Sequence, residues 1–285
     1  PFPSACAFVC EHPCEATCRR GMIDAPINIR AIKQHAVLTA GFVPAPAKAP
    51  ATGKRVAIIG GGPSGLSAAY YLALMGHDVT VFEQNDHLGG MMYYGIPRYR
   101  LPAENLDYDI DAILSLGVEV RYNTKVGVTV TWEEVEGSHD CVFVAIGAHH
   151  FRDLGIDYAT REGVFSAVQF LHRSSSGRPI DMAGKDVVIV GGGNVAMDAT
   201  RTAKRLGAAS VRCVYRRRKK DMTALPEEVN AAVEEGCSCR PCAWTPAPTS
   251  LSASSSNRRC PASIGADVPV PSRRAPRRPH SNATF

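Results

Sequence analysis

Short apolar runs alternate with amphipathic segments between residues 54 and 236. The run at 55–59 has the length and composition of a buried parallel strand, and the run at 187–190 resembles it. An amphipathic helical segment follows each run and ends at a glycine, Gly76 or Gly207. A second strand pattern follows each helix, at 78–83 and 210–215. This order of strand, helix and strand predicts two Rossmann-like α/β units built on parallel sheets.

The helical spacing also predicts which residues of these two helices face inward. In the first helix they are Ala68, Tyr71, Leu72 and Met75, and in the second Val195, Ala199, Thr202, Ala203 and Leu206.

The pattern is different on both sides of this region. Residues 1–40 hold four cysteines and one helical pattern at 27–38, and residues 41–53 form a Pro- and Ala-rich linker that we expect to be extended and stiff. Residues 238–285 show neither strand alternation nor a helical face. Pro and Ser are frequent among them, and this composition predicts a disordered tail.

Composition narrows the function class. The chain has 285 residues, 45% of them hydrophobic, and no apolar run approaches the ~20 residues of a membrane-spanning helix. Ten cysteines in an α/β chain indicate metal binding in the cytoplasm and not a disulfide scaffold. The net charge is +5, but positions 238–285 carry seven Arg and one Asp, or +6, which leaves −1 for positions 1–237. Nucleic-acid binding by this tail is the less favoured alternative, and we expect neither a nucleic-acid nor a membrane partner.

The first turn between strand and helix contains a G-x-G-x-x-G fingerprint, Gly60, Gly62 and Gly65. In this pattern the first glycine allows a tight turn, the second lets a pyrophosphate approach the backbone, and the third lets the helix pack on the strand. Glu83 closes the second strand, at the place where an acid accepts hydrogen bonds from an adenosine ribose. The alternative is a glycine turn without a ligand.

The second turn repeats this arrangement with Gly191, Gly193 and Ala196, and Asn194 within it is a further candidate cofactor-binding residue. Its second strand ends without an acid, at Arg216 and Arg217 followed by Arg218. Arginines at this place favour a 2′-phosphate, so the sequence predicts NADP(H) here. The alternative is a solvated basic strand end.

Four cysteines near the start, Cys6, Cys10, Cys14 and Cys18, are spaced four residues apart. One straight helix would spread their sulfurs over roughly 18 Å, but Pro13 interrupts it. Thiolates favour an iron–sulfur cluster or zinc, and the spacing alone leaves both open, together with disulfides or inert cysteines. A zinc site at Cys239, Cys242 and Cys260 is a weaker possibility, because no fourth ligand lies at a fitting distance.

Together these motifs resemble the small subunit of glutamate synthase and its relatives, which include the N-terminal part of dihydropyrimidine dehydrogenase. The resemblance runs from Cys6 to about Cys237. It rests on "CEHPCEATCRRG", "INIRAIKQHA", "GGGPSGLSAAYYLALMGHDVTVFE", "LGGMMYYGIPRYRLP", "FVAIGA", "VVIVGGGNVAMDATRTAKRLGA" and "YRRRKKDMTALPEEV", in this order.

The resemblance implies FAD on the first fingerprint and NADPH on the second, with hydride passing from one to the other and electrons leaving through [4Fe–4S] clusters to a larger partner subunit. Gly89 and Gly90 would form a second flavin-contacting turn, and Gly147 would mark where the chain leaves the FAD domain. No dedicated general base is expected, because hydride transfer between these rings needs none. The implied domains are a partial cluster-binding domain at 1–40, the linker at 41–53, the first part of an FAD domain at 54–150, an incomplete NADPH domain at 151–237 and the tail.

The resemblance also implies how the cysteines are used. Cys6, Cys10 and Cys14 would serve one cluster and Cys18 another, with the remaining ligands in a motif upstream of Pro1 that we expect the full protein to contain. The abrupt change after Cys237 leads us to expect a shifted reading frame in the tail. Two other functions stay open: an NADPH-oxidising subunit of a pyrimidine- or ferredoxin-linked complex, and an inactive truncated product that at most binds nucleotide.

Overall fold

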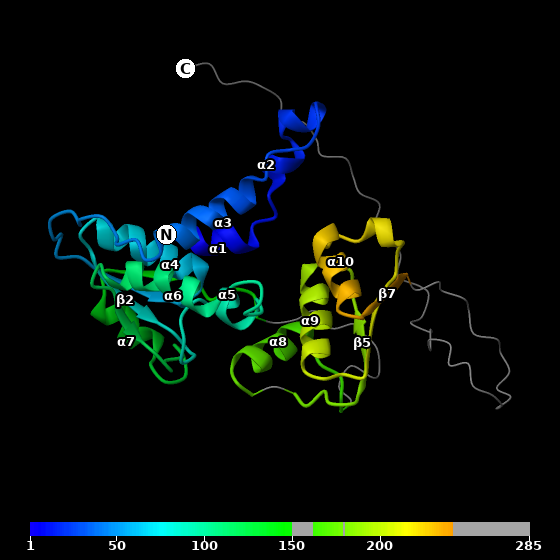
Figure 1. Ribbon diagram of the computed structural model, residues 1–285. Helices are drawn as coiled ribbons and strands as arrows, with labels where there is room; N and C mark the ends of the chain where they lie inside the picture. Colours follow the sequence, from blue (N-terminus) through cyan, green and yellow to red (C-terminus); the bar gives the residue numbers. More distant parts are fainter. Residues whose placement is uncertain (150–161, 179, 242–285) are drawn as a thin grey trace, which may run out of the picture. The chain divides into compact units, whose positions relative to one another are not determined.

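The computed structural model describes residues 1–149, 162–178 and 180–241. It confirms the predicted fold class, with two parallel sheets that each carry a fingerprint turn (Figure 1). The predicted FAD–NADPH domain boundary near residue 150 lies outside the described residues, as does the predicted tail from residue 242 onward.

The first sheet has the strand order β3-β2-β1-β4, and all its pairs are parallel. Val56 and Ile58 of β1 face a core shared with α4 and α6, whereas Ala57 faces α7 on the other side of the sheet (Figure 1). The elements of this part are β1 (Arg55–Ile59), α4 (Pro63–Leu74), β2 (Asp78–Phe82), α5 (Met91–Tyr94), α6 (Ala103–Leu114), β3 (Glu119–Arg121), α7 (Trp132–Ser138) and β4 (Cys141–Val144).

The second sheet has the order β5-β6-β7, again parallel. One face packs on α9 and its neighbours through Val211 and Cys213, whereas Val188 and Val190 on the other face are more than half exposed among the described residues. The elements are α8 (Ala167–Ser175), β5 (Asp186–Val190), α9 (Asn194–Arg205), β6 (Ser210–Tyr215), the 3₁₀ helix η2 (Lys219–Asp221), α10 (Pro226–Glu234) and β7 (Ser238–Pro241).

Strand β7 corrects one prediction. The sequence predicts no regular structure after Cys237, yet Ser238–Pro241 pairs in parallel with β6. The segment is too short to show strand alternation, and its backbone pairing with β6 makes it a strand. It follows α10 through Gly236, which has a positive φ of 83°.

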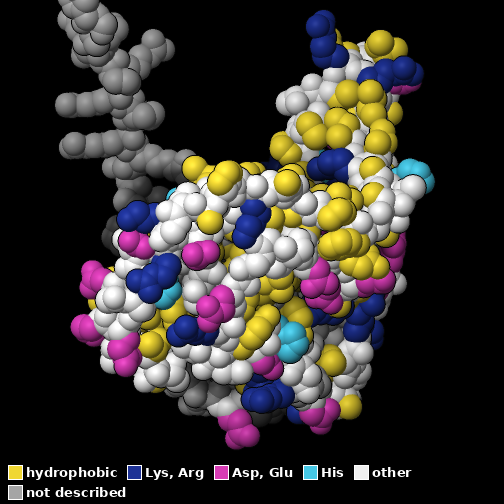
Figure 2. All heavy atoms as spheres, turned by 90° about the vertical axis from the view of Figure 1, so that its left-hand side faces the viewer, with side chains coloured by type: hydrophobic (Ala, Val, Ile, Leu, Met, Phe, Trp, Pro, Cys, Tyr) yellow, Lys and Arg dark blue, Asp and Glu magenta, His cyan; other side chains and the backbone are white. Residues whose placement is uncertain are grey.

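The N-terminal segment consists of α1 (Pro3–Val9), α2 (Pro13–Ala16), the 3₁₀ helix η1 (Arg19–Met22) and α3 (Ile29–Ala40). The buried carboxylate of Asp109 in α6 accepts hydrogen bonds from the backbone N–H groups of Ser4 (3.0 Å) and Ala5 (3.1 Å), which fixes the start of α1. No residue of α3 is buried. Figure 2 shows hydrophobic side chains on the part of the molecule that projects at its upper right. Met22 and Ile23 of the N-terminal segment are both more than four-fifths exposed.

Residues 41–53, predicted to be a linker, form neither a helix nor a strand. This segment is nevertheless held in place, since Ala49 N–H donates to the Leu74 carbonyl (2.8 Å) and Thr52 N–H to the Gly76 carbonyl (2.9 Å). In the part of the chain that the structure describes, every helix is too short or too polar to cross a bilayer.

Candidate functional site

The first fingerprint forms the turn between β1 and α4. Gly60 has a φ of +110°, which glycine adopts readily, and a Cβ on Gly65 would collide with the Gly60 carbonyl oxygen. Gly62 is different, because the nearest atom to a Cβ there would be the Gly90 Cα at 3.8 Å. The turn therefore needs glycine at two positions for its own conformation, whereas Gly62 leaves open space above the N-terminus of α4.

Glu83 follows β2 and is 4% exposed. Its Oε2 accepts a hydrogen bond from Gly61 N–H (2.8 Å), and its Oε1 accepts from the backbone N–H and the side-chain amide of Asn85 (both 2.8 Å). A carboxylate offers about four acceptor positions, so one remains at Oε2. The side chain is held in a fixed orientation with capacity for one further donor.

Two of the other residues that the resemblance assigns to the flavin, Gly89 and Gly90, lie beside this turn. Gly89 N–H donates to the Gly61 carbonyl (2.8 Å), and a Cβ on Gly90 would come within 2.7 Å of the Gly62 Cα. Gly147 follows β4 with a φ of +69°. These segments meet because the carboxyl ends of parallel strands lie at one edge of the sheet.

The second fingerprint joins β5 to α9. Gly191 has a φ of +152°, and a Cβ there would lie 3.1 Å from the Ala196 Cβ. A Cβ on Gly193 would meet only the Thr223 hydroxyl, at 3.4 Å. Asn194 begins α9; its Oδ1 accepts from Leu225 N–H (2.9 Å), and its Nδ2 donates to Glu11 Oε1 (2.7 Å). The turn is thus braced from both sides and open above Gly193.

Arg216 and Arg217 directly follow β6 and are exposed. Their neighbour Arg218 is engaged with Asp221, with Nε 2.9 Å from Oδ2. Among the described residues no carboxylate pairs with Arg216 or Arg217. Two guanidinium groups are therefore available at the strand end, where the sequence predicted a 2′-phosphate.

The four N-terminal cysteines are all free thiols, with Cys6 and Cys14 exposed. Backbone amides reach two of them: His12 N–H lies 3.4 Å from Cys10 Sγ, and hydrogen bonds from Ile27 and Arg20 lower the pKa of Cys18. Amide donors of this kind suit the thiolate ligands of a cluster. Within the described residues, however, no three Cys, His, Asp or Glu side chains gather closely enough to hold a metal ion.

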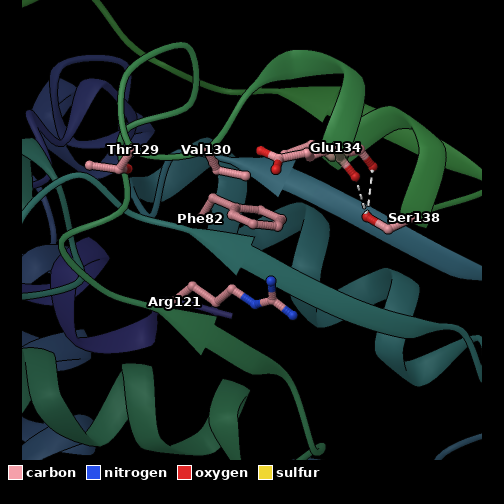
Figure 3. Close-up of a pocket in the computed structure, with 7 residues that line it drawn as sticks. Phe82, Arg121, Thr129, Val130, Glu134 and Ser138 are labelled. Carbon is pink, nitrogen blue, oxygen red and sulfur yellow. Dashed lines mark hydrogen bonds between the residues drawn. The ribbon is translucent and has the colours of Figure 1, made fainter.

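A hollow of about 290 Å³ lies on the α7 side of the first sheet, and none of the fingerprint residues lines it. Figure 3 shows Phe82 and Arg121 below Val130 and Glu134. Its polar groups serve local structure, because Glu134 caps α7 with Thr131 and the Ser138 hydroxyl donates to the Glu134 carbonyl (2.6 Å). We assign no chemistry to this hollow.

Sequence reasoning missed a buried ion-pair network. The Arg100 guanidinium, on the segment before α6, contacts Asp198 of α9 (2.9 Å) and Glu228 of α10 (3.0 Å). Arg201 joins Glu228 (2.8 Å) to Glu235 (2.9 Å). The side chains of Arg100, Asp198 and Glu228 are about one-tenth exposed or less. The network ties the second fingerprint helix to the segment that follows Gly89, Gly90 and α5.

Asp198 should make stability depend on pH. Burial raises its pKa to about 6, against the opposing effect of Arg100. The folded chain therefore binds more protons than the unfolded chain between about pH 4 and 6, and this carboxyl adds stability as the pH falls through 6. Urea unfolding measures the free energy of unfolding of the parent chain and of Asp198→Asn. The value for the parent minus the value for the variant should be larger at pH 5 than at pH 7.5.

Asp140 provides the control for this pH dependence. Its pKa is lowered by the Arg55 N–H and by Lys54, so this carboxyl is ionised in both the folded and the unfolded chain at pH 5 and at pH 7.5. The same difference for Asp140→Asn should therefore be equal at these two pH values and should decrease only below about pH 4. Parallel pH profiles for the parent chain and Asp198→Asn would contradict the prediction.

Comparison with known proteins places this geometry in a family. The model of the pyridine nucleotide-disulphide oxidoreductase family matches residues 54–238, from just before β1 to the first residue of β7. The chain belongs to this family. Both fingerprint turns lie inside the matched region.

Curated relatives confirm the resemblance drawn from the motifs. The NADPH-Fe(3+) oxidoreductase subunit beta of Geobacter sulfurreducens is 42% identical over 244 residues, which are 83% of this chain and 36% of that protein. The glutamate synthase [NADPH] small chain of Mycobacterium tuberculosis is 37% identical over 225 residues, 74% of this chain and 46% of that protein. The chain spans less than half the length of either relative.

Solved structures support the fold alone, because their sequence identity is low. FprA, an oxidoreductase of Mycobacterium tuberculosis solved with NADPH, gives a TM-score of 0.55 at 21% identity and covers 64% of this chain and 48% of that chain. A 2-naphthoyl-CoA reductase gives 0.56 at 22% identity, with 77% and 32% covered.

Proposed function

We propose that this chain is the nucleotide-binding part of an NADPH-oxidising electron-entry subunit, with FAD at the first fingerprint and NADPH at the second. When bound, the flavin would take hydride from NADPH and release single electrons through [4Fe–4S] clusters, to which Cys6, Cys10, Cys14 and Cys18 would contribute part of the ligands. The observation that carries this proposal is the contrast between the two open glycine turns, one beside an acid and the other beside two available arginines.

At the first turn, the α4 N-terminus and the space above Gly62 suit a pyrophosphate. The remaining acceptor position of Glu83 suits a ribose hydroxyl, and Gly89 and Gly90 bring a second stretch of backbone against the same turn. At the second turn, Gly193 and Asn194 offer the corresponding space at the α9 N-terminus.

A larger partner subunit would take the electrons. The exposed apolar side chains of the N-terminal segment, among them Met22, Ile23 and Ile32, support a protein partner there. They lie on the same segment as the cysteines, so a partner seated on it would lie close to the clusters.

One observation favours a complex other than glutamate synthase. The relatives named as subunits of an NADPH-Fe(3+) oxidoreductase and of an NADP(+)-dependent formate dehydrogenase are 42% and 41% identical, against 37% for the glutamate synthase small chain of Mycobacterium tuberculosis. The final acceptor is therefore open within this class. Identification of the large subunit that co-purifies with the full protein decides between glutamate synthase and another complex of this class.

Nucleotide preference tests the proposal directly. Replacing Arg216 and Arg217 together with alanine should weaken NADPH binding by roughly 1.5–3 kcal/mol for each lost charge-assisted bond, and NADH binding should barely change. Fluorescence titration of the parent and variant chains measures both affinities.

Arg218→Ala is the matched control for this titration, because Arg218 is engaged with Asp221. It should change the NADPH dissociation constant much less than the double variant does. Equal losses for NADPH and NADH in the double variant would refute the assignment of these arginines to a 2′-phosphate.

A further inference from the structure

Two cysteines that the proposed function does not use lie opposite each other in the second sheet. Cys213 of β6 and Cys239 of β7 are register partners in a parallel pair. Neighbouring strands run about 4.7–4.9 Å apart, and a disulfide needs a Cα–Cα distance of about 4.4–6.8 Å. The backbone therefore already brings this pair within bonding range.

The two thiols differ in their surroundings. Cys213 is 1% exposed, whereas Cys239 is half-buried and can be reached from solvent. The neighbouring Cys213 side chain, together with the charge of Lys219, lowers the pKa of Cys239 to about 7. The neighbouring Cys239 side chain, together with burial, raises the pKa of Cys213. An accessible thiolate beside a buried thiol is the usual arrangement of an attacking and a resolving cysteine.

Cys213 also contacts the second fingerprint. Its Sγ lies 3.2 Å from the carbonyl oxygen of Gly191, to which its thiol donates, and Gly191 N–H donates to the Val214 carbonyl (2.9 Å). The first glycine of the turn is thus hydrogen-bonded to β6 through both its carbonyl oxygen and its N–H. Any bond that draws the Cys213 sulfur toward β7 removes one of these two attachments.

We propose that Cys213 and Cys239 form an oxidisable thiol pair that closes to a disulfide between β6 and β7 and weakens dinucleotide binding at the second fingerprint. The second part rests on the proposed function, since it takes NADPH as the ligand of that turn. A bridge between directly opposed residues of neighbouring strands would be strained, and strained disulfides are the readily reduced, regulatory ones.

The chemistry balances with a peroxide as the oxidant. The Cys239 thiolate attacks one oxygen of hydrogen peroxide, which gives a sulfenic acid and hydroxide, and the hydroxide takes up a proton to become water. The Cys213 thiol then attacks the sulfenic sulfur, the S–S bond forms, and a second water leaves. The two sulfurs lose two electrons in total, and the peroxide gains them.

Mass spectrometry of the chain tests the first part. After limited hydrogen peroxide treatment, alkylation and digestion without reductant, tandem spectra should show a peptide joined through Cys213 and Cys239, and dithiothreitol should separate it. Cys237→Ser should keep this bridge, because Cys237 donates instead to the Thr200 carbonyl. Cys239→Ser should lose it. No linked peptide in the parent chain, or linkage only through Cys237, would overturn the inference.

Titration with NADPH tests the second part. Loss of one hydrogen bond is worth about 1 kcal/mol, so oxidation should raise the NADPH dissociation constant roughly fivefold, reversibly with dithiothreitol. Cys239→Ser should show no such response to peroxide. A bridged chain with unchanged affinity would overturn the link to the nucleotide turn. A reduced chain that does not bind NADPH at all would count against the proposed function and not against the thiol pair.

Discussion

Replacing Arg100 with methionine should lower the free energy of unfolding by about 3–5 kcal/mol, the usual effect of removing one partner from a buried ion pair. Arg100 contacts two carboxylates, Asp198 and Glu228, and all three side chains are almost fully buried. Without the guanidinium, two negative charges remain in a site that has lost one of its neutralising charges. Urea unfolding of the parent and the variant measures this loss, which is a large share of the roughly 5–15 kcal/mol typical of a folded domain.

Arg121→Met is the matched control, because Arg121 pairs with Glu119 in a bridge whose two side chains are each more than half exposed. A surface pair of this kind contributes about 0–1 kcal/mol. Adding Asp198→Asn to Arg100→Met should recover part of the loss by removing one of the uncompensated charges. Similar losses for Arg100→Met and Arg121→Met would show that burial of the network does not matter for stability.

The strands and fingerprint turns could be predicted because their signals are local. An apolar run, glycines at fixed spacing and a residue of known chemistry at the strand end are all written within one strand–helix–strand unit. The Arg100–Asp198 pair, in contrast, spans 98 positions. Neither residue stands out in the sequence, because an arginine and an aspartate are common on exposed helix faces and only packing brings them together.

The buried faces of the helices were predicted less well, and the position of Gly65 explains why in α4. The periodicity predicts that Tyr71 and Met75 face inward, but they are 56% and 60% exposed. The buried side chains of α4 are Leu66, Ala69 and Ala73. Gly65 touches the β1–α4 turn, and positions 69 and 73 follow it at intervals of four along the same face.

Small residues mark the face of α4 that approaches the sheet, and larger apolar residues lie to its side. In α9 the prediction was right for Ala199, Thr202 and Ala203, but Val195 is 49% exposed. The small residue of the fingerprint, Ala196, is again on the buried side. The small residues of the fingerprint therefore identify the buried face of each helix, which hydrophobic periodicity alone does not.

Replacing Gly62 with alanine should weaken the proposed binding of FAD without unfolding the chain. Gly62 has a φ of −85° and a ψ of −176°, which any residue adopts, and its Cβ would meet nothing closer than the Gly90 Cα at 3.8 Å. The added methyl group would instead fill the space that a pyrophosphate needs above the α4 N-terminus. Such overpacking costs about 1–3 kcal/mol, which corresponds to a roughly 5- to 150-fold weaker affinity.

Gly193→Ala makes the same change at the second fingerprint, where the Cβ would lie 3.4 Å from the Thr223 hydroxyl. It should weaken NADPH binding by a similar factor and leave FAD binding unchanged, while Gly62→Ala should do the reverse. Gly137→Ala, in α7 with no atom within 4 Å of the new Cβ, is the neutral control for both. Titration with each nucleotide and a thermal melt of each variant measure these effects. Each added methyl group acts only on the ligand that approaches its own helix N-terminus. A variant that loses both nucleotides while it keeps the melting temperature of the parent would therefore show that the two turns do not bind separate dinucleotides.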